Sequence, residues 1–211
     1  MTREILWILF LGALYLGLRY RPDWFKRVIS AVAGRAIGKA ALAAQPDTIT
    51  PMESTAGPAH PDARSALESL VRRGFEVVGS YVIPEMAGLP VHFLTRTEEC
   101  VIAVVYEHPK VGVWTDLATR YLDGTTFTIT NAPMGGGLEP RPGHEKLRVA
   151  GLTTAALHIR LLRDRPRKTP VEVRPSDVAR VFADAYAEEM AWRKGRGVST
   201  AEVRAVAFEN P

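Results

Sequence analysis

An unbroken apolar run near the start of the chain constrains its architecture most. Residues 5–18 (ILWILFLGALYLGL) carry no charged side chain, and Arg19 and Arg21 close the run. As a helix, residues 5–20 would rise about 24 Å at ~1.5 Å per residue, against a hydrocarbon core of roughly 30 Å. Local thinning of the bilayer and snorkelling of the two arginines close this gap. The sequence therefore predicts a transmembrane anchor over residues 1–21.

Two other interpretations of this run remain open. A cleaved signal peptide has an apolar region of similar length, but a small-residue cleavage site follows it. Here the run is followed by Arg-Tyr-Arg-Pro-Asp-Trp, and the first A-x-A pattern, at residues 41–43, lies far downstream. A buried core helix is the third interpretation, since 14 apolar residues are short for a span. The uncleaved anchor is favoured over both.

Basic side chains are concentrated directly after the anchor, where they set its orientation. Six residues are expected to contact lipid headgroups: Arg19, Arg21, Lys26, Arg27, Arg35 and Lys39. Only Arg3 precedes the run, so the positive-inside rule places the C-terminal part in the cytoplasm. Residues 62–211 hold 20 Lys/Arg and 19 Asp/Glu, a nearly neutral balance. This distribution indicates a lipid bilayer as partner and argues against nucleic-acid binding.

Residues 22–44 are expected to form a basic amphipathic helix beside the anchor. Pro22 suits a first helical turn, and apolar residues recur at spacings of one, three and four, flanked by the basic side chains. Such a helix lies in the headgroup layer. A second span is the alternative, but Arg35 and Lys39 would each cost ~2.5–3.5 kcal/mol at the bilayer centre.

The remainder is expected to comprise a Pro-rich linker over 45–61 and one globular domain over 62–211. Helical periodicity is found at 62–73, at about 154–163 and at 175–194, with a last short helix after 199. Strand patterns occupy 75–83, 91–97, 100–107, 111–122 and 125–131, with a further short candidate at 147–150. The short connections exclude βαβ crossovers between these strands. The fold class is therefore α+β, with a mainly antiparallel sheet of about five strands flanked by helices.

Three local features give sharper expectations. Asp123-Gly124 predicts a type I′ turn that joins two strands into a hairpin. Cys100, the only cysteine, excludes an intrachain disulfide and is interpreted as a small buried thiol. His158 lies on a helix with an aliphatic inner face and is expected at the solvent edge.

No stretch carries a catalytic, nucleotide-binding or metal-binding signature, so no catalytic residue, metal ligand or cofactor is predicted. The long loop over 132–146 contains three consecutive glycines, and long loops in compact domains are often functional. If this loop binds a small molecule, the candidate residues are Asn131, His144 and Glu145 at its two ends. The basic stretch 160–168 is expected either to be a solvated helix end or to touch anionic lipid or an acidic partner.

Two functions are compatible with this organisation. The favoured one is a non-enzymatic accessory or scaffold protein that presents its soluble domain at the membrane surface and binds another membrane-associated protein. The alternative is a membrane-anchored hydrolase or transferase with its site near residues 131–146. Alanine substitution at Asn131, His144 and Glu145 distinguishes them, since only the enzyme should depend on these side chains.

Overall fold

The computed structural model describes residues 36, 38–40, 42–133, 139–199, 201 and 202. Within these residues the chain forms one seven-stranded sheet with strands in sequence order, β1 to β7. All neighbouring strands are antiparallel except β6 and β7, which are parallel. The α+β class and the mainly antiparallel sheet are therefore confirmed.

The elements follow one another along the chain as β1 (Met52–Ser54), α3 (Pro61–Val71), β2 (Glu76–Ile83), β3 (Leu89–Arg96), β4 (Val101–His108), β5 (Gly112–Arg120), β6 (Thr126–Thr130), β7 (His144–Arg148), α4 (Thr154–Asp164) and α5 (Val178–Arg196). Short 3₁₀ turns, η1 (Pro84–Met86), η2 (Thr97–Glu99) and η3 (Pro175–Asp177), precede β3, β4 and α5.

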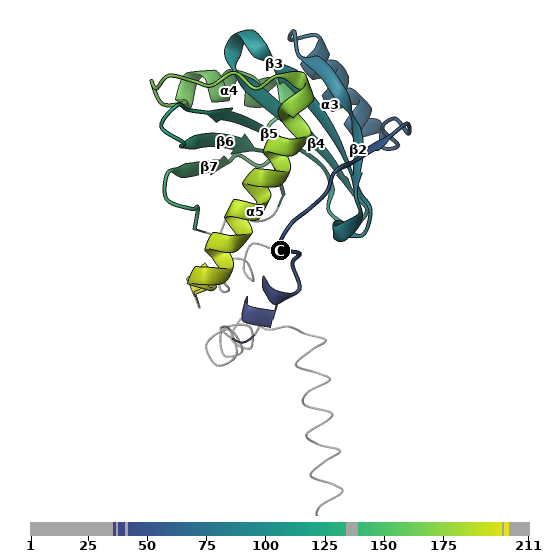
Figure 1. The fold of residues 1–211 in the computed structure, drawn as a ribbon. Helices are drawn as coiled ribbons and strands as arrows, with labels where there is room; N and C mark the ends of the chain where they lie inside the picture. Colours follow the sequence, from purple (N-terminus) through teal and green to yellow (C-terminus); the bar gives the residue numbers. More distant parts are fainter. Residues whose placement is uncertain (1–35, 37, 41, 134–138, 200, 203–211) are drawn as a thin grey trace, which may run out of the picture.

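Helices cover both faces of the sheet. α3 and α4 pack on one face, where the core contains Leu70, Val105, Leu117 and Leu161. α5 crosses the opposite face, where Phe182 packs on Phe93 with 5.1 Å between the ring centroids (Figure 1). Alternate residues of the central strands therefore enter different cores, which explains why residues 101–105 of β4 are all buried.

The sheet has seven strands, so the expectation of about five was wrong. The five strand patterns from residue 75 to 131 correspond to β2 to β6, and the structure adds one short strand at each edge. β1 lies inside the predicted linker and pairs Met52 with Val82 of β2. β7 begins at His144, within the predicted loop, and pairs in parallel with β6 from Thr126↔His144 onward. Both edge strands are short and mostly polar, so β1 shows no strand alternation, and the candidate at 147–150 overlaps only the last two residues of β7.

Local sequence signals account for the ends of α3. The His60 side chain accepts a hydrogen bond from the amide of Asp62 at 3.1 Å, and Pro61 occupies the first helical position. At the other end the amides of Gly74 and Phe75 donate to the carbonyls of Val71 and Leu70. This is a Schellman arrangement, and Gly74 supplies the positive φ of 84° that it requires.

The hairpin between β5 and β6 is confirmed, but the predicted type I′ turn is wrong. Gly124 has a φ of 81°, whereas Asp123 does not have the positive φ that a type I′ turn needs. The amide of Tyr121 donates to Thr125 O, so the loop has three residues and ends on the left-handed glycine. The Asp123 carboxylate accepts a hydrogen bond from the Thr125 amide at 3.0 Å, and this bond stabilises the turn without a positive φ at Asp123.

Cys100 also departs from expectation. It is half-buried rather than fully buried, and it follows η2 with a left-handed φ of 54°. β4 begins one residue later, at Val101. The apolar run that follows Cys100 is the central strand, and the cysteine itself belongs to the turn.

The predicted linker is folded against the domain. Ile49 is 4% exposed and lies in the core under α5. The Tyr186 hydroxyl of α5 donates to Pro46 O at 3.1 Å, and Lys194 Nζ donates to Gln45 O at 2.7 Å. The chain therefore passes from residue 45 into the sheet without a free spacer.

The predicted anchor over 1–21 and the headgroup contacts Arg19, Arg21, Lys26, Arg27 and Arg35 lie outside the described residues. Lys39 is described and exposed, within a helical stretch that covers residues 36, 38–40 and 42–43. Figure 1 places this stretch near the C-terminal end of α5. In the part of the chain that the structure describes, no helix is long and apolar enough to span a bilayer.

Candidate functional site

The three residues predicted around the 132–146 loop do not meet at one place. His144 pairs with Thr126 at the start of β6, whereas Asn131 follows the end of the same strand. Because β6 and β7 are parallel, the two residues lie about five strand positions apart, or roughly 16 Å at ~3.3 Å per residue. Glu145 is exposed and lies beside His144 on the edge strand.

Asn131 is held by backbone groups on both sides. Its Oδ1 accepts the amide of Thr115 at 2.7 Å, and its Nδ2 donates to Leu152 O at 2.9 Å. These bonds join the end of β6 to β5 and to the segment before α4. The amide of Asn131 is therefore engaged in holding three segments together.

His144 belongs to a small polar cluster between the sheet edge and α5. Its Nδ1 lies 3.0 Å from Thr126 Oγ1 and 3.3 Å from Arg141 Nη2. Arg141 also pairs with Glu188 of α5 at 2.8 Å. Burial and the neighbouring Arg141 charge lower the pKa of His144 below its usual range, so the imidazole stays neutral at pH 7.

A buried hydrogen-bonded relay crosses three strands on the face covered by α3 and α4, and the sequence reasoning missed it. Ser80 Oγ lies 2.8 Å from His92 Nδ1, and His92 Nε2 lies 2.6 Å from Glu107 Oε1. His92 is 2% exposed and Glu107 is 8% exposed. Each of the three residues is a polar side chain within a mainly apolar strand, but other polar residues occur in the same strands, and only the strand register shows that these three meet.

This Ser80–His92–Glu107 relay has the connectivity of a nucleophile, a base and an orienting acid. With the Nε2 proton directed at the carboxylate, Nδ1 accepts the hydrogen of the Ser80 hydroxyl. Both Glu107 oxygens also accept backbone amides, from Ala59 at 3.2 Å and from His60 at 2.7 Å. The relay thus attaches the segment that enters α3 to the middle of the sheet.

His158 contradicts its predicted position at the solvent edge. It is 1% exposed, packs edge-on against Phe75 and lies with Nε2 2.6 Å from Glu99 Oε2. The helical pattern placed it beside aliphatic residues, and the η2 turn brings a carboxylate over it. Burial lowers the pKa of His158, and Arg73 and Arg96 lower it further against the opposing effect of Glu99.

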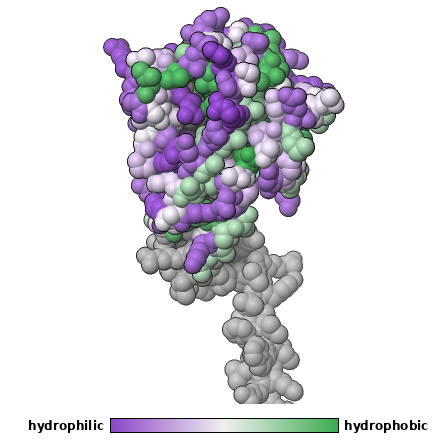
Figure 2. Space-filling model, in the orientation of Figure 1, coloured by the Kyte–Doolittle hydropathy of each residue, from purple (hydrophilic) through white to green (hydrophobic). Residues whose placement is uncertain are grey.

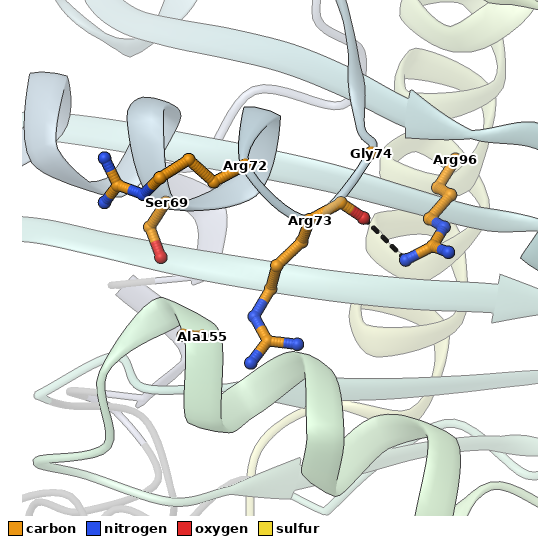
Figure 3. Close-up of a pocket in the computed structure, with 6 residues that line it drawn as sticks. All are labelled: Ser69, Arg72, Arg73, Gly74, Arg96 and Ala155. Atoms are coloured by element: carbon orange, nitrogen blue, oxygen red, sulfur yellow. Dashed lines mark hydrogen bonds between the residues drawn. The ribbon is translucent and has the colours of Figure 1, made fainter.

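An arginine pocket lies where α3, β3 and α4 come together (Figure 3). This open hollow of about 760 Å³ is lined by Ser69, Arg72, Arg73, Gly74, Arg96 and Ala155. Arg96 Nη1 donates to Arg73 O at 2.5 Å, which fixes one guanidinium group at the rim. The arrangement offers hydrogen-bond donors and positive charge, a combination that suits an anionic ligand.

The basic stretch 160–168 is largely paired within the domain. Asp164 accepts from Arg160 and Arg163, and Lys168 pairs with Asp123 at 2.9 Å. Arg165 donates to Glu99 O at 2.7 Å. Within the described residues, no group of three or more His, Cys, Asp or Glu is arranged to hold a metal ion.

Comparison of the chain with protein-family models, with curated proteins and with solved structures finds no match.

Proposed function

We propose that the protein is a membrane-anchored, non-enzymatic accessory or scaffold protein that presents its α+β domain to another membrane-associated protein at the cytoplasmic surface. The apolar run at 5–18 and the basic residues after it support membrane attachment. The neutral composition of residues 62–211 supports a protein partner rather than a nucleic acid.

The observation that carries this proposal is the docking of residues 45–54 onto the domain. Gln45 and Asp47 are bound by Lys194, Ile49 is buried, and β1 completes the sheet. A flexible spacer would let the domain sample many orientations, whereas this docked segment fixes the domain relative to the helical stretch before it. Fixed presentation of a surface is what a scaffold requires.

The exposed surface is compatible with a regulated contact. Hydrophilic side chains cover most of the face that includes α5, with apolar groups scattered among them (Figure 2). Interfaces that form and dissociate are about as apolar as the rest of a protein surface, so a surface of this composition is compatible with such a contact.

Fractionation and affinity capture test the proposal together. The full chain should resist a carbonate wash, and a variant lacking residues 1–44 should be released. The full chain, captured from detergent-solubilised membranes, should retain its specific partner after alanine substitution at Asn131, His144 and Glu145. Release of the intact chain by carbonate would refute the scaffold. Loss of the cellular phenotype in the triple variant, with the fold intact and the partner still bound, would also refute it.

A membrane-anchored hydrolase is the second candidate, and the Ser80–His92–Glu107 relay is the observation that favours it. Ser80 lies in the middle of β2 between Ser54 and His92, so its own amide belongs to the sheet ladder and does not serve as an oxyanion donor. The hydrolase predicts labelling of the full chain by a fluorophosphonate probe that is lost in Ser80→Ala. The scaffold predicts no labelling in either form.

A further inference from the structure

The arginine pocket draws its positive charge from separate parts of the fold. Arg72 and Arg73 end the α3 segment, Ser69 lies one turn earlier on the same helix, and Arg96 is the last residue of β3. Figure 3 shows the Arg73 side chain extending towards the first turn of α4 near Ala155. The Schellman turn at Gly74 sets this geometry, because it reverses the chain directly after the two arginines.

Arg73 is the least compensated charge in the pocket. Within the described residues its guanidinium group forms no ion pair, whereas Arg96 lies 3.3 Å from Glu99. Arg72 lies 3.7 Å from Glu68, but both side chains are more than two-thirds exposed, so water screens this pair. The pocket therefore has one unpaired guanidinium group and a second that is only weakly paired.

The first turn of α4 adds to the positive potential. Thr153 caps this helix by accepting the amide of Ala156. Among the described residues, the amides of Thr154 and Ala155 donate to no protein acceptor, and Ala155 lines the pocket. The helix dipole favours an anion at the same position that the Arg73 side chain approaches.

The other basic hollow differs in this respect. It is lined by the end of α4 and the residues after it, among them Arg163, Arg167 and Lys168. Arg163 and Lys168 are already bound to Asp164 and Asp123. Among the described residues Arg167 in that hollow forms no ion pair either, so what distinguishes the arginine pocket is that its unpaired Arg73 lies beside the free amides at the start of α4, whereas Arg167 follows the end of that helix.

We propose that the arginine pocket binds a phosphate group, carried either by a soluble phosphomonoester or by an anionic lipid headgroup. Guanidinium groups bind phosphate oxygens through paired N–H donors, and a dianion competes well with the distant Glu68 carboxylate. The pocket is open, so the rest of the ligand extends into solvent. All lining residues belong to the folded domain, and the site therefore does not depend on the proposed scaffold function.

The pKa of His158 reports on binding in the pocket. General screening by salt would change the pKa of other histidines as well, whereas an anion bound in the pocket should change that of His158 alone. Its pKa already responds to Arg73 and Arg96. A bound anion offsets these charges and should raise the pKa of His158. The pKa of His144 responds to Arg141, Glu188, Glu189 and Arg120 and to no arginine of the pocket, so this histidine serves as the internal control and should not change.

The experiment uses the full chain in phosphatidylcholine nanodiscs, with histidine NMR signals followed through a pH titration. Inorganic phosphate is added against sodium chloride at equal ionic strength, and a second set of discs contains phosphatidic acid. We expect a saturable rise of the His158 pKa with added phosphate. The affinity for phosphate obtained from this rise should fall by about tenfold or more in Arg73→Ala. Arg167→Ala, which removes an equal charge from the other hollow, should leave the affinity unchanged.

The two arms identify the source of the phosphate. A response to inorganic phosphate with none to phosphatidic acid assigns a soluble phosphomonoester, and an Arg73-dependent response to phosphatidic acid discs assigns a headgroup. No saturable response in either arm, or equal responses in Arg73→Ala and Arg167→Ala, overturns the proposal. Partner capture and carbonate fractionation are separate readouts, so failure of the scaffold leaves this result unaffected.

Discussion

Replacement of Glu107 by alanine tests the energetic role of the buried relay. The carboxylate accepts three hydrogen bonds, from His92 Nε2, from the amide of Ala59 and from the amide of His60. The Glu107→Ala variant leaves the His92 N–H without a partner at 2% exposure, which costs about 1–3 kcal/mol. Ala59 and His60 are exposed, so water replaces most of their two bonds. The total expected loss is about 2–4 kcal/mol.

Urea unfolding of the full chain in detergent micelles, followed by tryptophan fluorescence, measures this loss. Glu107→Gln keeps the size of the side chain and one acceptor, so it should lose less than Glu107→Ala. Glu98→Ala is the matched control, because Glu98 is 84% exposed and its loss should change the free energy of unfolding by less than about 0.5 kcal/mol. Hydrogen exchange should also accelerate in the first turn of α3, which Glu107 anchors.

A loss of less than about 1 kcal/mol in Glu107→Ala, or a loss no larger than that of Glu98→Ala, contradicts a stabilising role for the Glu107 hydrogen bonds. In that case water would satisfy His92, and the relay would contribute nothing to the attachment of α3. Unchanged exchange in the first turn of α3 would contradict the anchoring role even if the global stability fell.

Three further predictions concern pH, packing and backbone conformation. Because the pKa of His158 is lowered on folding, its contribution to stability is present above the unfolded pKa of about 6.5 and is lost as the pH falls. His158→Gln should therefore reduce the decrease in Tm between pH 7.5 and pH 5.5, and an unchanged decrease would contradict this prediction. Leu117→Ala, at a fully buried position, should lower the free energy of unfolding by about 2–5 kcal/mol in urea, and Leu122→Ala, at 76% exposure, by less than about 0.5; equal losses would refute the core assignment. Gly124→Ala should cost about 1–2 kcal/mol in the same assay because φ is 81°, whereas Gly57→Ala, with open space around it, should be nearly neutral.

Local signals in the sequence were sufficient for the elements whose stability comes from neighbouring residues. The turn at Gly74, the capped start of α3 and the hairpin around Gly124 all follow from residues within a few positions of one another. The five inner strands were also recognisable, because each is buried on at least one face and carries the corresponding apolar pattern. Of the edge strands, β1 was not recognised and β7 only at its end, through the candidate at 147–150, since hydrogen bonds to a neighbour rather than apolar burial define them.

For the site residues too, closeness in the sequence differs from closeness in the fold. Asn131, His144 and Glu145 are close to the ends of one loop in sequence, yet the parallel pairing of β6 and β7 separates Asn131 from the other two. Ser80, His92 and Glu107 are distant in sequence, and the registers of β2, β3 and β4 bring them into one relay.

The sequence by itself determined the period of each buried element, the positions of its turns and the concentration of basic residues beside the apolar run. These properties depend on residues that are adjacent along the chain. Only the tertiary structure decided that residues 45–47 bind α5 and residues 52–54 pair with β2, that His158 is buried under Glu99 and that Arg73 and Arg96 share a pocket. Such contacts depend on strand register and helix placement, which the packing of the whole domain sets.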